Sequence, residues 1–335
     1  MRAQVIHAHG AIEDITWEPN WRDPVPGAGE VVLKVGACAL NYHDLFSLRG
    51  MPGISLPFPL IMGIDVAGEV VRVGAGVTGV KVGDRVVVDP FDRETGVLLG
   101  ERADGGLAEY VKVAAKQLLP LPDDVSYEAA AALPVAYGTA YRMMVTRGRL
   151  VAGEKVFILG ASGGVGTCCV QLAKLAGCHV IVAASSKEKL ERLRALGADD
   201  GVDYTQGDWV REVQSRYGKA RFGGAGGGVD VVVNFTGGDT WVPSLKCLKN
   251  DGRLLTCGAT AGYDPKEDIR YIWTFELNII GSNAWTRDDV ASLIELVRQR
   301  KLVPVVDRVL PLEQAREAFR LLDERKVVGK LVLKP

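Results

Sequence analysis

Residues 156–177 of the chain, VFILGASGGVGTCCVQLAKLAG, hold a glycine cluster between a run of β-branched and aromatic residues and an amphipathic stretch. The cluster fits the pattern G-x-G-x-x-G, with alanine in the first glycine position. Such glycines let the backbone approach a pyrophosphate, and backbone N–H groups at the start of the following helix bind the anion. The sequence therefore predicts a dinucleotide-binding loop made by Ser162, Gly163, Gly164, Val165 and Gly166.

The position that separates NAD from NADP lies at the end of the next strand-like run, in VIVAASSKEK. An acidic residue there hydrogen-bonds the adenosine ribose 2′-hydroxyl and would repel a 2′-phosphate. This chain has Ala184 instead, followed by Ser185, Ser186, Lys187 and Lys189. Two hydroxyls and two ammonium groups suit a dianion. The sequence therefore predicts NADP(H) as the cofactor, with Ser185, Ser186 and Lys189 at the phosphate.

Composition limits the classes of function. Of the 335 residues, 47% are hydrophobic and 24% are charged, and the net charge is −1, so no charged field favours nucleic acid or an anionic membrane. The N-terminus lacks the apolar region of a signal peptide, and no apolar run reaches the ~18 residues of a membrane span. The six cysteines are not spaced as a disulfide framework. We therefore expect a cytoplasmic protein with a small-molecule substrate and with neither nucleic-acid nor membrane partners.

The elements that must position these residues change in character along the chain. Residues 1–125 contain short, alternating, valine-rich runs separated by turn residues, which predicts a β-domain of barrel or sandwich type. Across residues 126–301, strand-like runs alternate with helical stretches at 164–176 and 187–196, which predicts a doubly wound parallel sheet. Residues 302–335 are expected to return to the first domain and complete it. The fold class is thus α/β, and we expect a cleft between the two lobes.

Longer motifs carry a family resemblance that runs nearly end to end. They are ALNYHDLFSLRG (39–50), GIDVAGEVVRVGAGVTGVKVGDRVVV (63–88), GGLAEYVKV (105–113), LGADDGVDYT (196–205) and the final GKLVLKP. On these motifs the chain resembles the zinc-free quinone oxidoreductase-like branch of the medium-chain dehydrogenase/reductase superfamily. The resemblance implies a GroES-like β-domain that carries the substrate site and a Rossmann domain that binds NADP.

Further residues of the cofactor site are predicted from strand ends and from the family resemblance. The runs NFTGG, CGATAG and GSNAW occupy strand ends, which line the cofactor crevice of a doubly wound sheet, and they place Phe235, Gly258 and Asn283 there. The resemblance adds Tyr204 beside the adenosine phosphate. It also implies a homodimer or tetramer that pairs sheet edges, with residues 278–284 as the edge strand.

The resemblance also bears on metal binding. Zinc-dependent relatives take ligands from a cysteine, a His-Glu pair and a later cysteine or aspartate, and the matching positions here are Asn41, Ile64 with Asp65, and Val135. A catalytic zinc needs about three N, O or S ligands, and this set does not supply them. Relatives with a structural zinc have four cysteines in the lobe that is residues 89–106 here, and this lobe has none. We expect no metal at either site.

Without zinc, hydrogen-bond donors must stabilise the negative charge that develops on the substrate during hydride transfer. The segment NYHD supplies the candidate catalytic groups. Asn41 offers an amide, Tyr42 a phenol and His43 an imidazole at the proton-relaying Ser/Thr position of zinc relatives, while Asp44 is either catalytic or the cap of a turn or helix. The resemblance implies an NADPH-dependent reductase of an activated C=C bond (enone or enoyl) or a quinone. The alternatives are a metal-free NADP-linked alcohol or carbonyl dehydrogenase and a non-catalytic NADPH-binding protein.

Overall fold

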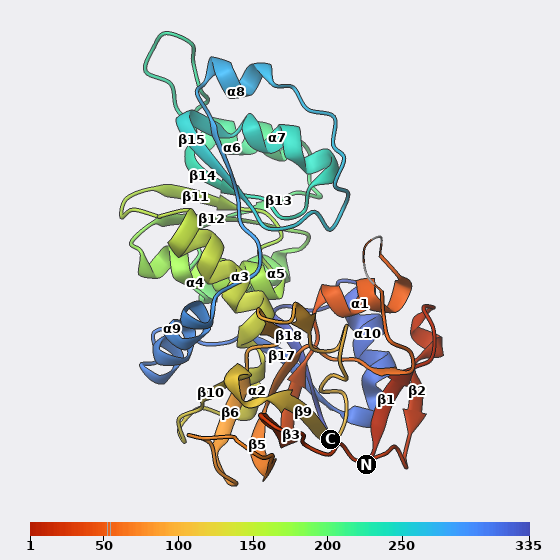
Figure 1. Ribbon diagram of the computed structural model, residues 1–335. Coiled ribbons are helices and arrows are strands. Elements are labelled where there is room, and N and C mark those ends of the chain that lie inside the picture. Colours follow the sequence, from red (N-terminus) through yellow and green to blue (C-terminus); the bar gives the residue numbers. More distant parts are fainter. Residues whose placement is uncertain (52, 54) are drawn as a thin grey trace. The chain divides into compact units, whose positions relative to one another are not determined.

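The computed structural model describes residues 1–51, 53 and 55–335. The chain forms two compact units, residues 1–137 with 290–335 and residues 138–289. Figure 1 shows an antiparallel β-rich unit and a unit in which helices flank a parallel sheet. Within the described part of the chain, no helix has the length and apolar character needed to cross a membrane.

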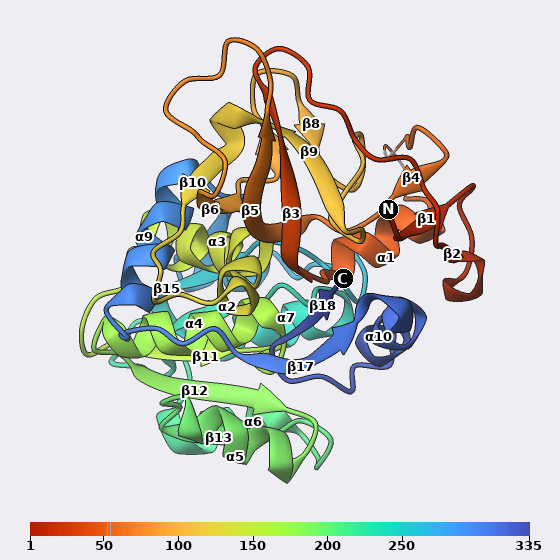
Figure 2. The same ribbon diagram turned by 90° about the horizontal axis from the view of Figure 1, so that it is seen from below.

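The main sheet of the first unit has the strand order β10-β6-β5-β3-β18-β17, and β9 also pairs with β3. Its strands are β3 (Glu30–Ala39), β5 (Asp65–Val73), β6 (Arg85–Val88), β9 (Tyr110–Ala114), β10 (Leu118–Pro120), β17 (Val306–Pro311) and β18 (Lys330–Lys334). All neighbours are antiparallel except β17 and β18, which run side by side and parallel (Figure 2). Because β18 pairs with β3, the C-terminal tail completes the sheet of the first unit.

Smaller elements close this unit around its apolar core. They are the strands β1 (Ala3–Ile6), β2 (Thr16–Glu18), β4 (Leu60–Ile61), β7 (Phe91–Asp92) and β8 (Val97–Leu98), and the helices α1 (Tyr42–Arg49), α2 (Tyr127–Ala131) and α10 (Ala315–Asp323). Helix α2 packs on β3 and β5 where Gly36 leaves room, because a Cβ at Gly36 would lie 2.4 Å from the Tyr127 ring. The first unit therefore extends past the expected boundary at residue 125. At the other boundary, α9 (Arg287–Arg298) crosses from one unit to the other, so the expected division at residue 301 also differs from the observed one.

The second unit is a six-stranded sheet in the order β13-β12-β11-β14-β15-β16. Its strands are β11 (Lys155–Ile158), β12 (His179–Ala184), β13 (Asp200–Asp203), β14 (Val229–Val233), β15 (Leu248–Thr256) and β16 (Asn278–Gly281). Every pair is parallel, so the predicted doubly wound sheet is confirmed. The central strands are nearly all apolar because helices cover both faces.

Figure 1 shows which helices cover each face of this sheet. Helices α4 (Gly164–Leu175) and α5 (Lys187–Ala195) lie on one face, and α6 (Trp209–Tyr217) and α7 (Trp241–Leu245) lie on the other. The chain changes faces between β11 and β14, which is where such sheets bind their ligands. Strand β16 pairs with β15 alone among the described strands, so it is an edge strand; its pairing with a second copy stays a prediction.

Candidate functional site

The predicted glycine loop joins β11 to α4. The backbone turns at Gly160, which has a φ of +66°, and α4 begins at Gly164 with Gly163 as its N-cap. The turn that the glycine pattern assigns to its first position is therefore made one residue earlier, by Gly160. This explains why the pattern tolerates Ala161, whose side chain is buried.

Gly166 is required by close backbone packing. A Cβ on this residue would lie 2.3 Å from the carbonyl oxygen of Gly160 and 2.5 Å from the Cα of Ala161. Among the described residues, no side chain caps the first turn of α4, so backbone N–H groups at the start of this twelve-residue helix are available to an anion. The loop therefore fits a pyrophosphate.

The predicted phosphate-selecting residues follow β12. Ala184 is the last residue of the strand and is only 2% exposed, so Ser185 is the first accessible side chain beyond it. Ser186 caps α5, its Oγ accepting a hydrogen bond from the Lys189 backbone N–H at 3.3 Å. The backbone N–H of Tyr204 donates to the carbonyl of Ala184 at 3.2 Å, which brings the half-exposed Tyr204 beside this strand end.

One acid lies near this strand end that the sequence pattern did not single out. Asp203, the last residue of β13, pairs in register with Ala184. Its Oδ1 atom accepts hydrogen bonds from the backbone N–H and the hydroxyl of Thr205, at 3.0 and 2.6 Å. One oxygen of the carboxylate is thus engaged by its own turn.

The other predicted cofactor residues gather at neighbouring strand ends of the same sheet. The Phe235 ring lies against Gly160, since a Cβ there would be 2.8 Å from the ring, and Gly258 lies near the Phe235 carbonyl. Asn283 is exposed just beyond β16. Sequence reasoning missed Asn234, a fully buried side chain whose Oδ1 accepts from the backbone N–H groups of Thr236 and Gly237 and so shapes this crevice.

The NYHD segment forms the start of α1 in the first unit. Asn41 is the N-cap, and its backbone N–H donates to Asp44 Oδ2 at 2.7 Å. Asp44 therefore closes the first turn of the helix, which is the capping role weighed for it from sequence. Burial raises its pKa to about 6, against the opposing effect of that hydrogen bond. No described residue hydrogen-bonds its second oxygen, Oδ1.

The Asn41 side chain belongs to a buried polar network. Its Nδ2 donates to Asp65 Oδ2 at 2.8 Å, and its Oδ1 accepts from Lys330 Nζ at 2.5 Å. Lys330 also pairs with Asp65 at 3.2 Å, and the Val135 backbone N–H donates to the other Asp65 oxygen at 3.0 Å. Burial raises the pKa of Asp65, while Lys330, Asn41 and Val135 oppose the rise. The network joins β18 to the start of α1 and to β5.

The two remaining members of NYHD are more accessible. Tyr42 is half-buried, its ring packs edge-on against Phe46, and its hydroxyl has no hydrogen-bond partner among the described residues. The His43 Nε2 atom donates to Glu101 Oε2 at 2.6 Å. Sequence reasoning missed Glu101 and Lys330. Lys330 did stand in a recognised motif, the final GKLVLKP, but no local signal connected it to Asn41.

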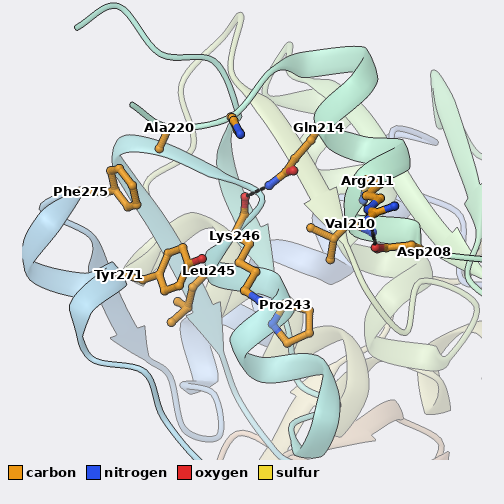
Figure 3. A pocket seen from close by; sticks show the side chains of 11 residues that line it. Asp208, Val210, Arg211, Gln214, Ala220, Pro243, Leu245, Lys246, Tyr271 and Phe275 are labelled. Carbon is orange, nitrogen blue, oxygen red and sulfur yellow. Dashed lines mark hydrogen bonds and ion pairs between the residues drawn. The ribbon is translucent and has the colours of Figure 1, made fainter. Parts of the chain in front are cut away.

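A separate cavity of about 580 Å³ lies between α6, α7 and α8 (Arg270–Thr274). Figure 3 shows Lys246, Tyr271 and Arg211 around it, with Gln214 donating to the Lys246 carbonyl. Arg211 is paired with Asp208. None of the predicted site residues is among the described residues that line this cavity.

Comparisons with known proteins agree with both units. The family model described as the alcohol dehydrogenase GroES-like domain matches residues 27–123, and the one described as zinc-binding dehydrogenase matches residues 164–299. The acryloyl-coenzyme A reductase of Sulfurisphaera tokodaii is 30% identical, with 93% of this chain and 94% of that protein covered.

Two solved structures extend the comparison, and each alignment covers all of both chains. An NAD-dependent alcohol dehydrogenase is 37% identical with a TM-score of 0.91. A mycobacterial quinone oxidoreductase is 28% identical with a TM-score of 0.81. The expected pairing of a GroES-like domain with a Rossmann domain is confirmed. The chain therefore belongs to the medium-chain dehydrogenase/reductase superfamily, in its quinone oxidoreductase-like branch, and is an oxidoreductase that uses a nicotinamide cofactor.

Proposed function

We propose that this protein is a zinc-independent reductase that uses NADPH to reduce an activated C=C bond or a quinone. The observation that carries the proposal is the buried network in which Lys330 bonds Asn41 and Asp65, because these two residues stand at positions that hold zinc ligands in zinc-dependent relatives. A reductase of this kind depends on protein hydrogen-bond donors in place of a Lewis acid.

The residues of this network do not fit a catalytic zinc. The Asn41 carbonyl oxygen and one Asp65 oxygen already accept from the Lys330 ammonium, which places a positive charge where a metal ion would have to bind. Val135 contributes a backbone N–H donor to the other Asp65 oxygen. The donor atoms that zinc requires are thus engaged, and the proposed reaction has no metal-dependent step.

The glycine loop and the residues after β12 fit the dinucleotide. When bound, NADPH supplies the hydride. The first turn of α4 would hold the pyrophosphate, and the Ser185 hydroxyl and Lys189 ammonium would hold the 2′-phosphate by charge-assisted hydrogen bonds. Phe235 and Gly258 line the crevice at the ends of β14 and β15.

Of the four NYHD side chains, Tyr42 is the best placed to polarise a substrate oxygen. The Asn41 amide and the Asp44 carboxylate are buried, and both already form hydrogen bonds within the first unit. The Tyr42 hydroxyl has no described partner and can donate to an oxygen on which negative charge develops. An enone, an enoyl thioester or a quinone spreads that charge onto an oxygen, which suits a single donor. The similarity to an acryloyl-coenzyme A reductase supports the same substrate class.

The first prediction concerns metal content. Protein purified without added metal is expected to contain well under one zinc per chain and to keep its activity in EDTA, because the Lys330 ammonium engages the oxygens of Asn41 and Asp65, which stand at ligand positions. Elemental analysis and assays with and without chelator check this. Stoichiometric zinc whose removal abolishes turnover would contradict the proposal.

The second prediction concerns the substrate and the cofactor. A panel of enones, quinones, enoyl-coenzyme A thioesters and aldehydes should show reduction of an enone, enoyl or quinone substrate, with NADPH preferred over NADH by at least ~10-fold, or about 1.4 kcal/mol. Ala184→Asp and Ser185→Asp should each weaken NADPH binding, because a carboxylate repels the 2′-phosphate.

Three outcomes would count against this assignment. Equal use of both cofactors by the unmodified protein would refute the interpretation of the residues after β12. Exclusive reduction of aldehydes would favour the metal-free carbonyl or alcohol dehydrogenase. Tight NADPH binding without turnover on the whole panel would favour a non-catalytic NADPH-binding protein.

A further inference from the structure

The His43–Glu101 pair takes no part in the charge stabilisation proposed for Tyr42. The Nε2 atom of His43 and the Oε2 atom of Glu101 are 2.6 Å apart. The His43 side chain is 35% exposed, whereas that of Glu101 is 9% exposed. The buried Glu101 carboxylate thus holds the Nε2 atom of a partly exposed His43 imidazole.

Glu101 is held in place by the backbone around it. It follows Gly100, where a Cβ would lie 2.9 Å from the backbone of Gly63. Further along the same loop, the Gly105 and Gly106 N–H groups donate to the carbonyls of Ile61 and Gly63, at 2.7 and 2.8 Å. These hydrogen bonds hold the loop against the segment that leads into β5, so the backbone that carries the Glu101 side chain is fixed in position.

The hydrogen bond also fixes the protonation pattern of His43. An ionised carboxylate only accepts hydrogen bonds, so Nε2 must carry a proton. In the neutral imidazole Nδ1 is then a lone-pair acceptor, and in the imidazolium Nδ1 carries a proton that can be given away. No described residue hydrogen-bonds to Nδ1.

The charges around His43 favour the imidazolium. Burial acts to lower the pKa of His43, but the Glu101 hydrogen bond and the charges of Asp44 and Glu101 outweigh it and raise the pKa. Two positively charged features disfavour the imidazolium. One is the positive end of the α1 dipole, at the start of that helix, and the other is Arg102, whose Nε lies 3.6 Å from Glu101 Oε1.

We propose that His43 is the proton donor of the reduction and that Glu101 is its positioning residue, holding Nε2 so that Nδ1 is left to give its proton to the substrate. This inference rests on the proposed function. It assigns two separate tasks to adjacent residues: Tyr42 stabilises the charge on the substrate oxygen, and His43 completes the reduction by protonating carbon.

For an enone, addition of hydride to the β-carbon brings two electrons and leaves an enolate. The enolate electron pair forms a bond from the α-carbon to the Nδ1 proton as the Nδ1–H bond breaks. His43 is left as a neutral imidazole whose Nε2–H bond still donates to Glu101, and solvent water then returns a proton to Nδ1. For a quinone, the same proton goes to the second oxygen.

The test compares two variants with two matched controls. His43→Gln removes the proton, and Glu101→Gln keeps a hydrogen-bond acceptor but removes the carboxylate. Glu94→Gln is the control for Glu101, because Glu94 is 79% exposed in the same lobe, and His7→Gln is the control for His43. All are assayed as full-length protein with NADPH and 2-methyl-2-cyclohexenone, or the best acceptor found, after thermal unfolding has verified folding.

His43→Gln is expected to lower kcat by about 10²-fold, with an unchanged Kd for NADPH and reduced stereoselectivity at the α-carbon. Glu101→Gln is expected to lower kcat by about 10-fold or more, and the fall in rate at alkaline pH should begin at lower pH, because loss of the carboxylate lowers the pKa of the donor. The controls should match the unmodified protein. Full kcat in either variant, on an acceptor that the unmodified protein reduces, overturns the inference.

A second measurement does not depend on turnover. In ¹⁵N NMR spectra of the four-histidine protein, His43 should carry its neutral-form proton on Nε2, and its titration midpoint should fall in Glu101→Gln. A proton on Nδ1, or a midpoint that does not move, overturns the role of Glu101. Absence of turnover on every acceptor, with these NMR results as expected, would instead mean that the proposed function is wrong.

Discussion

Lys330→Met is expected to lower the free energy of unfolding by about 3–5 kcal/mol. The Lys330 side chain is 3% exposed, and it pairs with Asp65, which is fully buried. Removing the ammonium leaves the Asp65 carboxylate buried with only the Asn41 amide and the Val135 N–H as partners. It also frees β18 from the start of α1, two segments that are 289 residues apart in the chain. Chemical denaturation with matched m-values measures the effect.

Two further variants make this result specific. Lys334→Met, on the same strand, removes a half-exposed lysine paired with Glu128 and should cost no more than about 1 kcal/mol. The double variant Lys330→Met with Asp65→Asn should be less destabilised than the sum of the two single variants, since no uncompensated charge stays buried. Equal losses from Lys330→Met and Lys334→Met, or simple additivity in the double variant, would show that the buried pair does not stabilise the fold as argued.

Tyr42→Phe is expected to lower kcat by roughly 10²-fold, about 3 kcal/mol of transition-state stabilisation, with little change in NADPH binding. The substitution keeps the ring that packs against Phe46 and removes the hydroxyl, which no described residue engages. A donor that acts on developing charge affects the transition state more than the ground state, so kcat should fall more than KM rises. Steady-state kinetics on the best substrate and NADPH fluorescence titration measure both effects.

Two other variants serve as controls for Tyr42→Phe. Tyr110→Phe alters a half-buried tyrosine on β9 and should leave kcat unchanged. Asn41→Ala should act mainly on stability, because its amide binds Asp65 and Lys330 inside the first unit. If Tyr42→Phe retains nearly full kcat, the polarising donor has to be a different group, such as a backbone amide or a ribose hydroxyl of the cofactor.

The sequence by itself determined the features that depend on neighbouring residues. The glycine loop was predictable because a strand, a turn and a helix N-terminus follow one another within residues 155–166, and each leaves a local pattern. The parallel sheet was predictable for the same reason, since apolar strands alternate with helices along the chain. Even the capping of α1 is a local signal, because Asn41 and Asp44 are three residues apart.

Tertiary structure decided which of these groups are left for chemistry. Sequence placed Asn41, Tyr42, His43 and Asp44 together as candidates, but folding brings Lys330 to Asn41 and Glu101 to His43, across 289 and 58 residues. Helix α2 is a similar case, because it packs on β3 where Gly36 has no side chain, a contact between segments about 90 residues apart. Contacts between distant segments depend on how whole sheets and loops pack, and no pattern of neighbouring residues records them. The order of amino acids thus specified the reactive groups, and only packing decided which are buried in the network and which have an atom free to donate.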